Sequence, residues 1–290
     1  SGQFDFNDWD KQQVLQDLRA FMPTANILHL LSQLSPYECD GLSAYRKVPK
    51  MVVLPETIEQ CQQVVRYCRQ HSIPLIARGA GTGLAGGVLP VEQAIVLSLA
   101  KFNKITQIDP LQRIAIVEPG VRNLAISEAA AQYGLYYAPD PSSQIACSIG
   151  GNVAENSGGV HSLKYGLTVN NVLGLKVINS DGELLDIGGG ECMDSPGYDL
   201  LALMHGSEGL LGIILEVTLR LIPKPPNAQV VLAAFNEIVD AGKAVRDIIS
   251  GGIIPAGLEM MDKLAIQAAE DFVHADYPLA QALLLCELDG

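Results

Sequence analysis

Residues 78–87 read Arg78-Gly79-Ala80-Gly81-Thr82-Gly83-Leu84-Ala85-Gly86-Gly87, with glycine at five of the nine positions after the arginine. The apolar run Pro74-Leu75-Ile76-Ala77 just before them predicts a short buried strand. Glycine tolerates positive φ angles and carries no side chain, so successive N–H groups of such a loop can converge on an anion. We therefore expect the backbone of this loop to bind a pyrophosphate.

Two common phosphate-binding motifs do not explain the loop. Residues 81–86 match G-x-G-x-x-G, but a Rossmann loop opens a helix and is followed about 20 residues later by an acidic residue. Here Val88-Leu89-Pro90 follows, then a predicted strand at 94–98, and Lys101 and Asn103 stand where the acidic residue is needed. A Walker loop is excluded because no Gly-Lys-Ser/Thr occurs. A plain surface connection is the alternative, but the loop joins two apolar strands, which favours a dinucleotide site outside the Rossmann fold.

The composition indicates an ordered globular protein with about two domains, since 48% of its 290 residues are hydrophobic and 18% are charged. With 19 Lys and Arg against 32 Asp and Glu, the net charge is −13, which argues against nucleic acid or an anionic membrane as a partner. No apolar run of about 18 residues predicts a transmembrane helix, and the first residues lack the features of a secretory signal. We expect a cytoplasmic protein.

The cysteines and most histidines predict no special chemistry. The six cysteines, at positions 39, 61, 68, 147, 192 and 286, form no C-x-x-C pair. Cys61 and Cys68 are separated by about 10 Å of rise on a predicted helix, too far for a disulfide, so we expect reduced thiols. His29, His71 and His274 show no metal-ligand spacing. His205 is expected to cap or pack, and Gly188–Gly190 with Glu191 and Cys192 to form a solvent loop.

Hydrophobic periodicity and turn residues predict alternating helices and strands. Helices are expected up to Ser35 with a break at Pro23, from a Thr57/Gln60 capping box, from an Asn123 cap to Gly134, and at 237–250 and 262–273. Strands are expected at 51–54, 74–77, 94–98, 104–109, 113–118, 172–179, 183–187, within 210–222, and at 229–235, 257–261 and 282–288. Asp181-Gly182 predicts a type I′ hairpin turn. The proline cluster at 223–226 predicts a domain boundary, giving domains 1–222 and 223–290.

A second glycine-rich region begins at Pro139-Asp140-Pro141-Ser142-Ser143 and continues through Ser148-Ile149-Gly150-Gly151-Asn152-Val153-Ala154-Glu155-Asn156-Ser157-Gly158-Gly159. Small, hydroxyl and amide residues dominate it. Such residues let a backbone pass close to a planar ligand and hydrogen-bond its polar edge. Two regions of this kind in one domain strengthen the prediction of a dinucleotide site.

The order of five motifs resembles the FAD-binding domain of the vanillyl-alcohol-oxidase and p-cresol-methylhydroxylase (PCMH) class. These motifs are Val52-Val53-Leu54-Pro55, residues 78–83, residues 139–142, residues 148–152 and Glu208-Gly209-Leu210-Leu211-Gly212-Ile213. Within this class, Cys39-Asp40-Gly41-Leu42-Ser43-Ala44-Tyr45-Arg46 and Gly257-Leu258-Glu259-Met260-Met261-Asp262 resemble the D subunits of bacterial glycolate oxidases. These are relatives of the D-lactate and D-2-hydroxyglutarate dehydrogenases.

The resemblance implies an α+β protein with a two-subdomain PCMH-type FAD-binding fold, followed by a partial ferredoxin-like cap. It implies non-covalent FAD, because relatives that attach flavin through the first loop have histidine where Thr82 stands. The implied cofactor-binding residues are Arg78, Gly79, Ala80, Gly81, Thr82, Gly83, Leu84, Pro139, Asp140, Ser142, Ser143, Ser148, Gly150, Gly151, Asn152, Gly158 and Ile213. Two readings of Arg78 stay open: a charge beside the phosphates, or a structural salt bridge at a strand end.

The implied activity is oxidation of a small 2-hydroxy acid, glycolate or D-lactate, with electrons passed to partner subunits rather than NAD. Through such partner subunits the protein is also expected to associate peripherally with the inner membrane. The alternatives are a reductase of the same fold and a module that only relays electrons. His161 and Lys164 are weak catalytic candidates. The alternative for His161 is a structural role as a hydrogen-bonded loop histidine. Family members carry later H-x-G-D-G-N-x-H and S-G-E-H-G-I-G motifs, which supply metal ligands and a base. Neither occurs here, so we expect the base and any metal site to lie beyond residue 290 and these 290 residues to be inactive alone.

Overall fold

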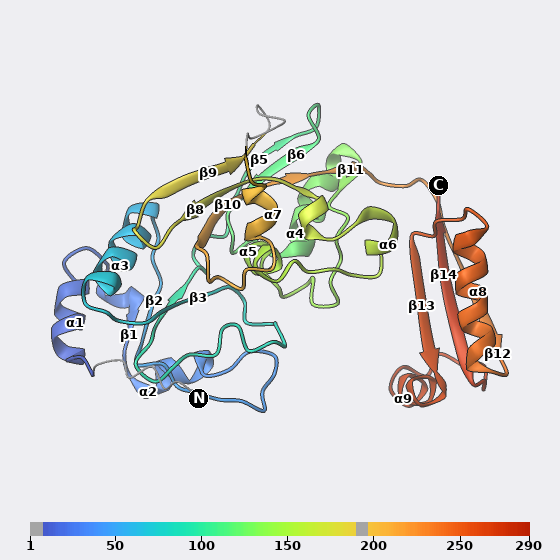
Figure 1. Ribbon diagram of the computed structural model, residues 1–290, viewed down its shortest axis with the longest axis horizontal. Helices are drawn as coiled ribbons and strands as arrows, with labels where there is room; N and C mark the ends of the chain where they lie inside the picture. The colour runs from blue at the N-terminus through green and yellow to red at the C-terminus, as the bar shows by residue number, and fades with distance from the viewer. Residues whose placement is uncertain (1–7, 190–196) are drawn as a thin grey trace.

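The computed structural model describes residues 8–189 and 197–290 (Figure 1). Its longer helices and the short ones between them are α1 (Lys11–Leu18), α2 (Leu31–Leu34), α3 (Ile58–Gln70), α4 (Asn123–Ala130), α5 (Ile149–Glu155), α6 (Ser162–Tyr165), α7 (Leu200–Met204), α8 (Ile238–Ser250) and α9 (Lys263–Val273). Its strands are β1 (Ile27–Leu28), β2 (Met51–Val53), β3 (Leu75–Arg78), β4 (Ile95–Ser98), β5 (Ile105–Asp109), β6 (Ile114–Val117), β7 (Leu135–Tyr136), β8 (Val172–Ile178), β9 (Leu184–Gly188), β10 (Ile213–Arg220), β11 (Ile222–Pro223), β12 (Ala228–Phe235), β13 (Gly257–Asp262) and β14 (Ala282–Asp289).

The first subdomain is a sheet of order β1-β2-β4-β3, in which β2, β4 and β3 run parallel and β1 is antiparallel. Helix α3 makes the crossover from β2 to β3. It begins where Thr57 Oγ1 accepts a hydrogen bond from the N–H of Gln60 (3.2 Å), as the sequence predicts. The buried stripe of α3 packs with α1 on one face of the sheet, through Cys61, Val64, Val65 and Cys68. Strand β3 therefore ends, at Arg78, directly at the glycine loop.

The second subdomain is an antiparallel sheet of order β5-β6-β10-β8-β9, with α4, α5 and α7 contributing to its core. Strand β10 belongs to both subdomains. Ile213 and Leu215 pack in the core of the first, whereas Val217 and Leu219 pack in that of the second. A register shift against β8 between Ile214 and Glu216 lets the alternation slip by one residue. One strand thereby joins the two subdomains.

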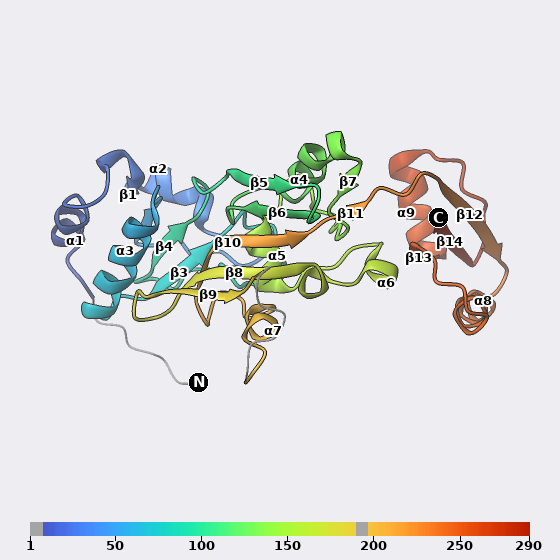
Figure 2. The same cartoon turned by 90° about the horizontal axis from the view of Figure 1, so that it is seen from above.

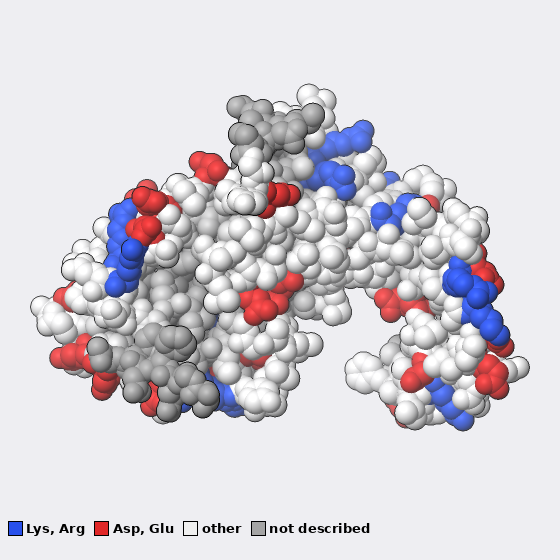
Figure 3. All heavy atoms as spheres, in the orientation of Figure 1, with Lys and Arg blue, Asp and Glu red and all other residues white. Residues whose placement is uncertain are grey.

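The third part, which we call the cap, comprises residues 224–290. Its sheet has the order β12-β14-β13, with β14 antiparallel to both neighbours and α8 and α9 as the connecting helices. Figures 1 and 2 show the cap standing beside the second subdomain, at the end of the molecule away from the first. Figure 3 shows a broad hollow between the two-subdomain body and the cap, with acidic side chains on both of its sides.

The structure corrects the predicted N-terminal helix and two local motifs. Residues 8–35 contain α1, β1 and α2, because Ile27 and Leu28 pair with β2. Arg122 rather than Asn123 precedes α4, and the Asn123 amide instead donates to the carbonyl of Pro139 (3.1 Å). The Thr57 capping box is incomplete, since the Gln60 side chain accepts from the N–H of Glu56.

The hairpin between β8 and β9 forms as predicted, but its turn is not type I′. That turn needs positive φ at both central residues, and of Asp181 and Gly182 only Gly182 has one, at 75°. The side chain of Asn179 instead accepts hydrogen bonds from the N–H groups of Asp181 and Glu183 (2.9 Å each), which closes a longer loop. The predicted solvent loop that includes Glu191 and Cys192 lies largely outside the described residues.

The proposed domain boundary remains a prediction. Strand β11 spans the predicted division between residues 222 and 223 and pairs with β7 of the second subdomain. The N–H of Lys224 also donates to the carbonyl of Gly134 (2.9 Å). The chain leaves the body only after this point.

Candidate functional site

A cleft opens where the glycine loop after β3 faces the start of α5 and the loop before β10. Of the residues predicted to bind a dinucleotide, the cleft is lined by Arg78, Gly79, Ala80, Gly81, Thr82, Gly83, Ser143, Ser148, Gly150, Gly151, Asn152 and Ile213. Leu84, Pro139, Asp140, Ser142 and Gly158 are not among the lining residues. The two glycine-rich regions, far apart in sequence, thus meet at one site.

Further lining residues were not predicted, among them Asp40, Pro119, Cys147, Glu155 and Glu208. Pro119 and Cys147 carry no sequence signal for a ligand. Glu208 opens the fifth motif and Asp40 lies in the motif at 39–46. The resemblance could therefore have predicted both as lining residues. Five cysteines are free thiols. Cys147 is buried, as are Cys61, Cys68 and Cys286, whereas Cys39 is half-buried.

The two walls of the cleft touch directly. A Cβ atom on Gly79 would lie 2.4 Å from Oγ of Ser148, and that hydroxyl accepts a hydrogen bond from the N–H of Ala80 (3.3 Å). No hydrogen bond to another described residue uses the N–H groups of Gly79, Gly81, Thr82 or Gly83. These N–H groups are available to a ligand, as the glycine pattern predicts.

Asp40 fixes the far end of the glycine loop. Its carboxylate accepts hydrogen bonds from the N–H groups of Leu42 (2.8 Å) and Gly86 (2.9 Å). The neighbouring Gly41 donates its N–H to the carbonyl of Gly83 (2.9 Å), and a Cβ on Gly41 would lie 2.8 Å from the carbonyl oxygen of Thr82. The motif at 39–46 therefore holds the loop in shape.

Arg78 is a buried cation with an unsatisfied donor. The residue is 7% exposed, and its Nη1 has no hydrogen-bond partner among the described residues. Burial lowers the pKa of Arg78 below its ordinary value. Its guanidinium lies over the ring of Tyr37 at 5.5 Å, and no carboxylate of the described residues forms an ion pair with it. The sequence left two roles open for Arg78, a charge beside the phosphates or a structural salt bridge. The structure does not show the salt bridge among its described residues.

Asn152 offers a second unsatisfied donor in the same cleft. It lies in α5, is 3% exposed, and its Nδ2 has no partner among the described residues. Buried polar groups are nearly always hydrogen-bonded, so two unpaired donors lining one cleft indicate a missing acceptor. A dinucleotide supplies phosphate and carbonyl oxygens of this kind.

Helix α5 was missed by the sequence analysis, which treated residues 148–159 as a glycine-rich region. Its Gly150 lies against Pro119: a Cβ on Gly150 would lie 2.6 Å from the Cβ of that proline. The N–H of Gly150 donates to the Pro119 carbonyl (2.8 Å). Close packing, rather than flexibility, accounts for glycine at this position.

His161 and Lys164 lie on the body where it contacts the cap, and neither lines the cleft. His161 contacts Asp140 through Nδ1 (2.6 Å), and Lys164 forms an ion pair with Asp289 of β14. Asp140, predicted to bind the cofactor, is thus engaged by His161. The structure shows no free base or nucleophile at either position.

Comparison with known proteins decides the family. Residues 49–188 match the family of FAD-binding domains, and residues 224–290 match the C-terminal domain of FAD-linked oxidases. Across 98% of this chain, the protein is 59% identical to "Glycolate oxidase subunit GlcD" of Escherichia coli. The chain belongs to the FAD-linked oxidase family. Its predicted cofactor, FAD, agrees with the matched FAD-binding domain.

Other FAD-linked oxidases show the breadth of the family. The chain is 40% identical to the glycolate oxidase subunit GlcD of Bacillus subtilis over 88% of its length, and 37% identical to a D-lactate dehydrogenase of Archaeoglobus fulgidus over 76%. The alignments cover 57%, 54% and 49% of the Escherichia coli, Bacillus subtilis and Archaeoglobus fulgidus proteins, respectively. The chain thus spans about half the length of these relatives.

Solved structures confirm the predicted fold. An alkyldihydroxyacetonephosphate synthase has a TM-score of 0.83 at 19% identity, with 97% of this chain and 56% of that chain covered. A p-cresol methylhydroxylase with substrate bound has a TM-score of 0.79 at 21% identity, with 96% and 60% covered. The PCMH-type FAD-binding fold predicted from the motif order is therefore correct.

Two features are absent from residues 8–189 and 197–290. No helix there has the length and apolar character to cross a bilayer. No group of three or more His, Cys, Asp or Glu side chains there is arranged to hold a metal ion.

Proposed function

We propose that this chain binds FAD non-covalently in the cleft and belongs to an enzyme that oxidises a small 2-hydroxy acid, glycolate or D-lactate, to the 2-oxo acid. The observation that carries the proposal is the pair of unsatisfied donors, Arg78 Nη1 and Asn152 Nδ2, beside a loop with free N–H groups. The 59% identity to a glycolate oxidase subunit supports the substrate class.

In this proposal FAD, when bound, supplies a flavin ring that accepts a hydride from the α-carbon of the substrate. The chain's own residues bind and orient it. The N–H groups of Gly79, Gly81, Thr82 and Gly83 hold the pyrophosphate, and the Arg78 cation offsets its charge at short range in a poorly solvated position. Asn152 donates to an acceptor on the same dinucleotide.

The proton of the substrate hydroxyl needs a base. His161 is held by Asp140 of the body and Glu287 of the cap, and Lys164 by Asp289 of the cap, which argues against either as that base. Electrons then pass to an acceptor other than NAD. Since the Escherichia coli and Bacillus subtilis relatives are named as subunits, we propose further oxidase subunits as that acceptor and as the link to the inner membrane.

A chimera tests the proposal. Residues 1–290 replace the aligned part of the Escherichia coli glycolate oxidase subunit, and the purified chimera is mixed anaerobically with glycolate and with D-lactate. We expect bleaching of the flavin absorbance by at least one of them. A chimera that retains FAD but is bleached by neither contradicts the proposed substrate class, and one that binds no FAD contradicts the proposed site.

The same reduction experiment on the 290-residue chain alone is the second test. We expect this chain to bind FAD but to be reduced at least 100-fold more slowly than the chimera, because a positioned base contributes typically about 10²–10⁴-fold. Reduction at a comparable rate places the base among these residues, with His161 and Lys164 the first to be tested.

A further inference from the structure

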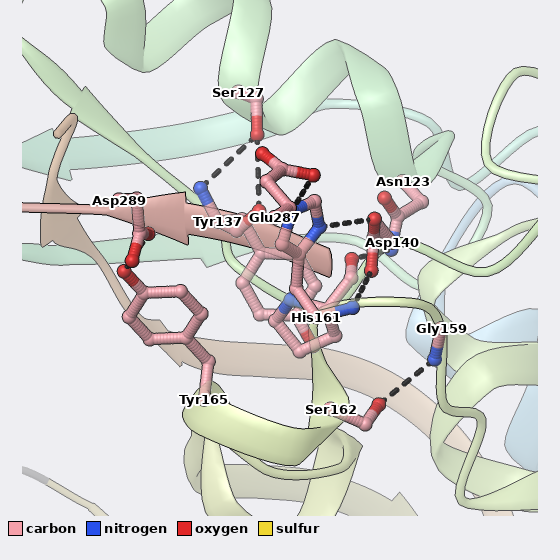
Figure 4. A network of polar contacts seen from close by, with 11 residues as sticks. Asn123, Ser127, Tyr137, Asp140, Gly159, His161, Ser162, Tyr165, Glu287 and Asp289 are labelled. Carbon is pink, nitrogen blue, oxygen red and sulfur yellow. Dashed lines mark hydrogen bonds and ion pairs between the residues drawn. The ribbon is translucent and has the colours of Figure 1, made fainter. Parts of the chain in front are cut away.

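His161 lies between two carboxylates that come from different parts of the chain. Nδ1 lies 2.6 Å from Oδ2 of Asp140, in the loop after β7, and Nε2 lies 3.2 Å from Oε2 of Glu287, in β14 of the cap. Figure 4 shows the imidazole between these two side chains. An imidazole with a carboxylate at each nitrogen can donate to both only in its protonated form.

The loop that carries His161 is fixed to the body. The backbone N–H of His161 donates to Oδ1 of Asp140 (3.2 Å), and the N–H of Gly159 donates to Oγ of Ser162 (2.8 Å). A Cβ on Gly159 would lie 2.2 Å from the carbonyl oxygen of Asp140, so only glycine fits there. Asp140 and His161 therefore form a fixed pair on the body, to which Glu287 is the cap's contribution.

The remaining contacts of this junction carry little dependence on pH near neutrality. In α6, Lys164 and Tyr165 both contact Asp289 of β14 through charge and hydrogen bonds. Strand β13 contributes Gly257, which packs against Val160. The titratable groups that face the junction besides His161 are Asp140, Glu287, Asp289, Lys164, Tyr136 and Tyr165. Among these residue types histidine alone has an ordinary pKa near neutrality.

We propose that His161 is a proton-dependent latch, which ties the cap to the FAD-binding body when its imidazole is protonated and releases that tie when it is neutral. With one proton lost, only one ring nitrogen can donate, and the other faces a carboxylate without a hydrogen between them. Asp140 keeps its bond because it also accepts from the His161 backbone. Glu287 is the partner that is lost, and the cap then keeps its contacts through Asp289 with Lys164 and Tyr165.

The direction of titration agrees with this geometry. Burial lowers the pKa of His161, but the hydrogen bonds and charges of Asp140 and Glu287 together outweigh burial, so the pKa lies above its ordinary value of 6.5. A raised pKa means that the contribution of the latch is complete below pH 6.5 and is lost as pH rises through the folded-state pKa. The latch is therefore engaged in mildly acid solution and opens toward alkaline pH.

Two measurements on the 290-residue chain test the latch. The first is the side-chain ¹⁵N titration of His161 by NMR, in the wild type and in Glu287→Gln. We expect a pKa above 6.5 in the wild type and a lower one in the variant. A wild-type pKa at or below 6.5, or one that Glu287→Gln leaves unchanged, overturns the proposal.

The second measurement is amide hydrogen exchange of residues 157–166 and of β14, at pH 6 and pH 8.5, corrected for the intrinsic exchange rate. We expect protection to fall about two- to fivefold at the higher pH, the factor of a partly exposed ion pair, and His161→Gln to remove this difference. His29→Gln, a histidine of the first subdomain without a carboxylate contact, is the matched control and keeps it. Lys164→Met lowers protection equally at both pH values. A pH difference that survives in His161→Gln contradicts the latch.

Discussion

Gly81 leaves the space of its side chain to Arg78. A Cβ atom on Gly81 would lie 2.3 Å from Nη2 and 2.7 Å from Cζ of that arginine, and the φ of Gly81 is +71°. Glycine thus serves two needs at this position, a left-handed backbone and room for a buried guanidinium.

Gly81→Val therefore displaces the Arg78 guanidinium and strains the backbone by about 1–2 kcal/mol. We expect flavin occupancy of the purified protein to fall at least tenfold while the far-ultraviolet circular dichroism stays close to that of the wild type. The matched control is Gly86→Ala, also at positive φ but with no atom within 4 Å of its Cβ, which tests strain alone. Equal occupancy in Gly81→Val and the wild type removes this loop from the site.

Arg78→Met keeps the length of the side chain and removes its charge. If the guanidinium faces the pyrophosphate, FAD affinity falls at least tenfold, about 1.4 kcal/mol, as measured by quenching of flavin fluorescence. Arg246→Met on the exposed side of α8 is the control, since Arg246 pairs only with the adjacent Asp247. An unchanged affinity in Arg78→Met assigns the arginine a purely structural place.

Two glycine-to-alanine changes have opposite expected effects on stability. Gly150→Ala brings a Cβ to 2.6 Å from Pro119 in a packed region, which costs about 1–3 kcal/mol. Gly242→Ala lies in α8 with no atom within 4 Å and stabilises that helix by about 0.5–1 kcal/mol. Urea unfolding of both variants measures the two effects, and a stabilised Gly150→Ala contradicts the close approach.

His205 predicts an acid-sensitive step. It is 9% exposed, its Nδ1 lies 2.7 Å from the carbonyl of Leu201, and its Nε2 has no partner among the described residues. Burial lowers the pKa of His205 below 6.5, so its contribution to stability is present above pH 6.5 and is lost as pH falls through the folded-state pKa. We expect His205→Asn, whose amide can replace the Nδ1 donor, to lose less stability between pH 7.5 and pH 5 than the wild type. Parallel urea curves that shift equally with pH contradict this.

The flavin is expected to leave the unfolded chain. Thr82 occupies the position at which relatives carry an attachment histidine. The hydroxyl of Thr82 is the one nucleophilic side-chain group in the loop 79–83. Acid denaturation and filtration should release all of the flavin, and mass spectrometry should identify it as FAD. Flavin that stays with the polypeptide points to Cys147, which lines the cleft.

The sequence predicts the parts of this protein whose local pattern and packing agree. Helix α3, with its Thr57 cap and buried stripe, and the strands on either side of the glycine loop are examples. Helix α5 could not be found in the same way, because glycines are poor helix formers, although the helix buries Ile149 and Val153. Local propensity was outweighed there by tertiary packing.

The site was predictable as a set of loops but not as a set of contacts. Glycine content identified the residues around Gly79 and Gly150, whereas the unsatisfied donor of Arg78 depends on the absence of a carboxylate, which no spacing reveals. Asp140 shows the converse. Its place in a motif suggested the cofactor, yet its partner is His161, 21 residues further along the chain.

The register shift in β10 has a consequence for how the body unfolds. Ile213 and Leu215 are core residues of the first subdomain, and Val217 and Leu219 are core residues of the second. Because one strand supplies side chains to both cores, we expect the two subdomains to melt as one cooperative unit. The walls of the cleft belong to different subdomains, and they are therefore assembled and lost together, without a half-built intermediate that could bind only one end of a dinucleotide.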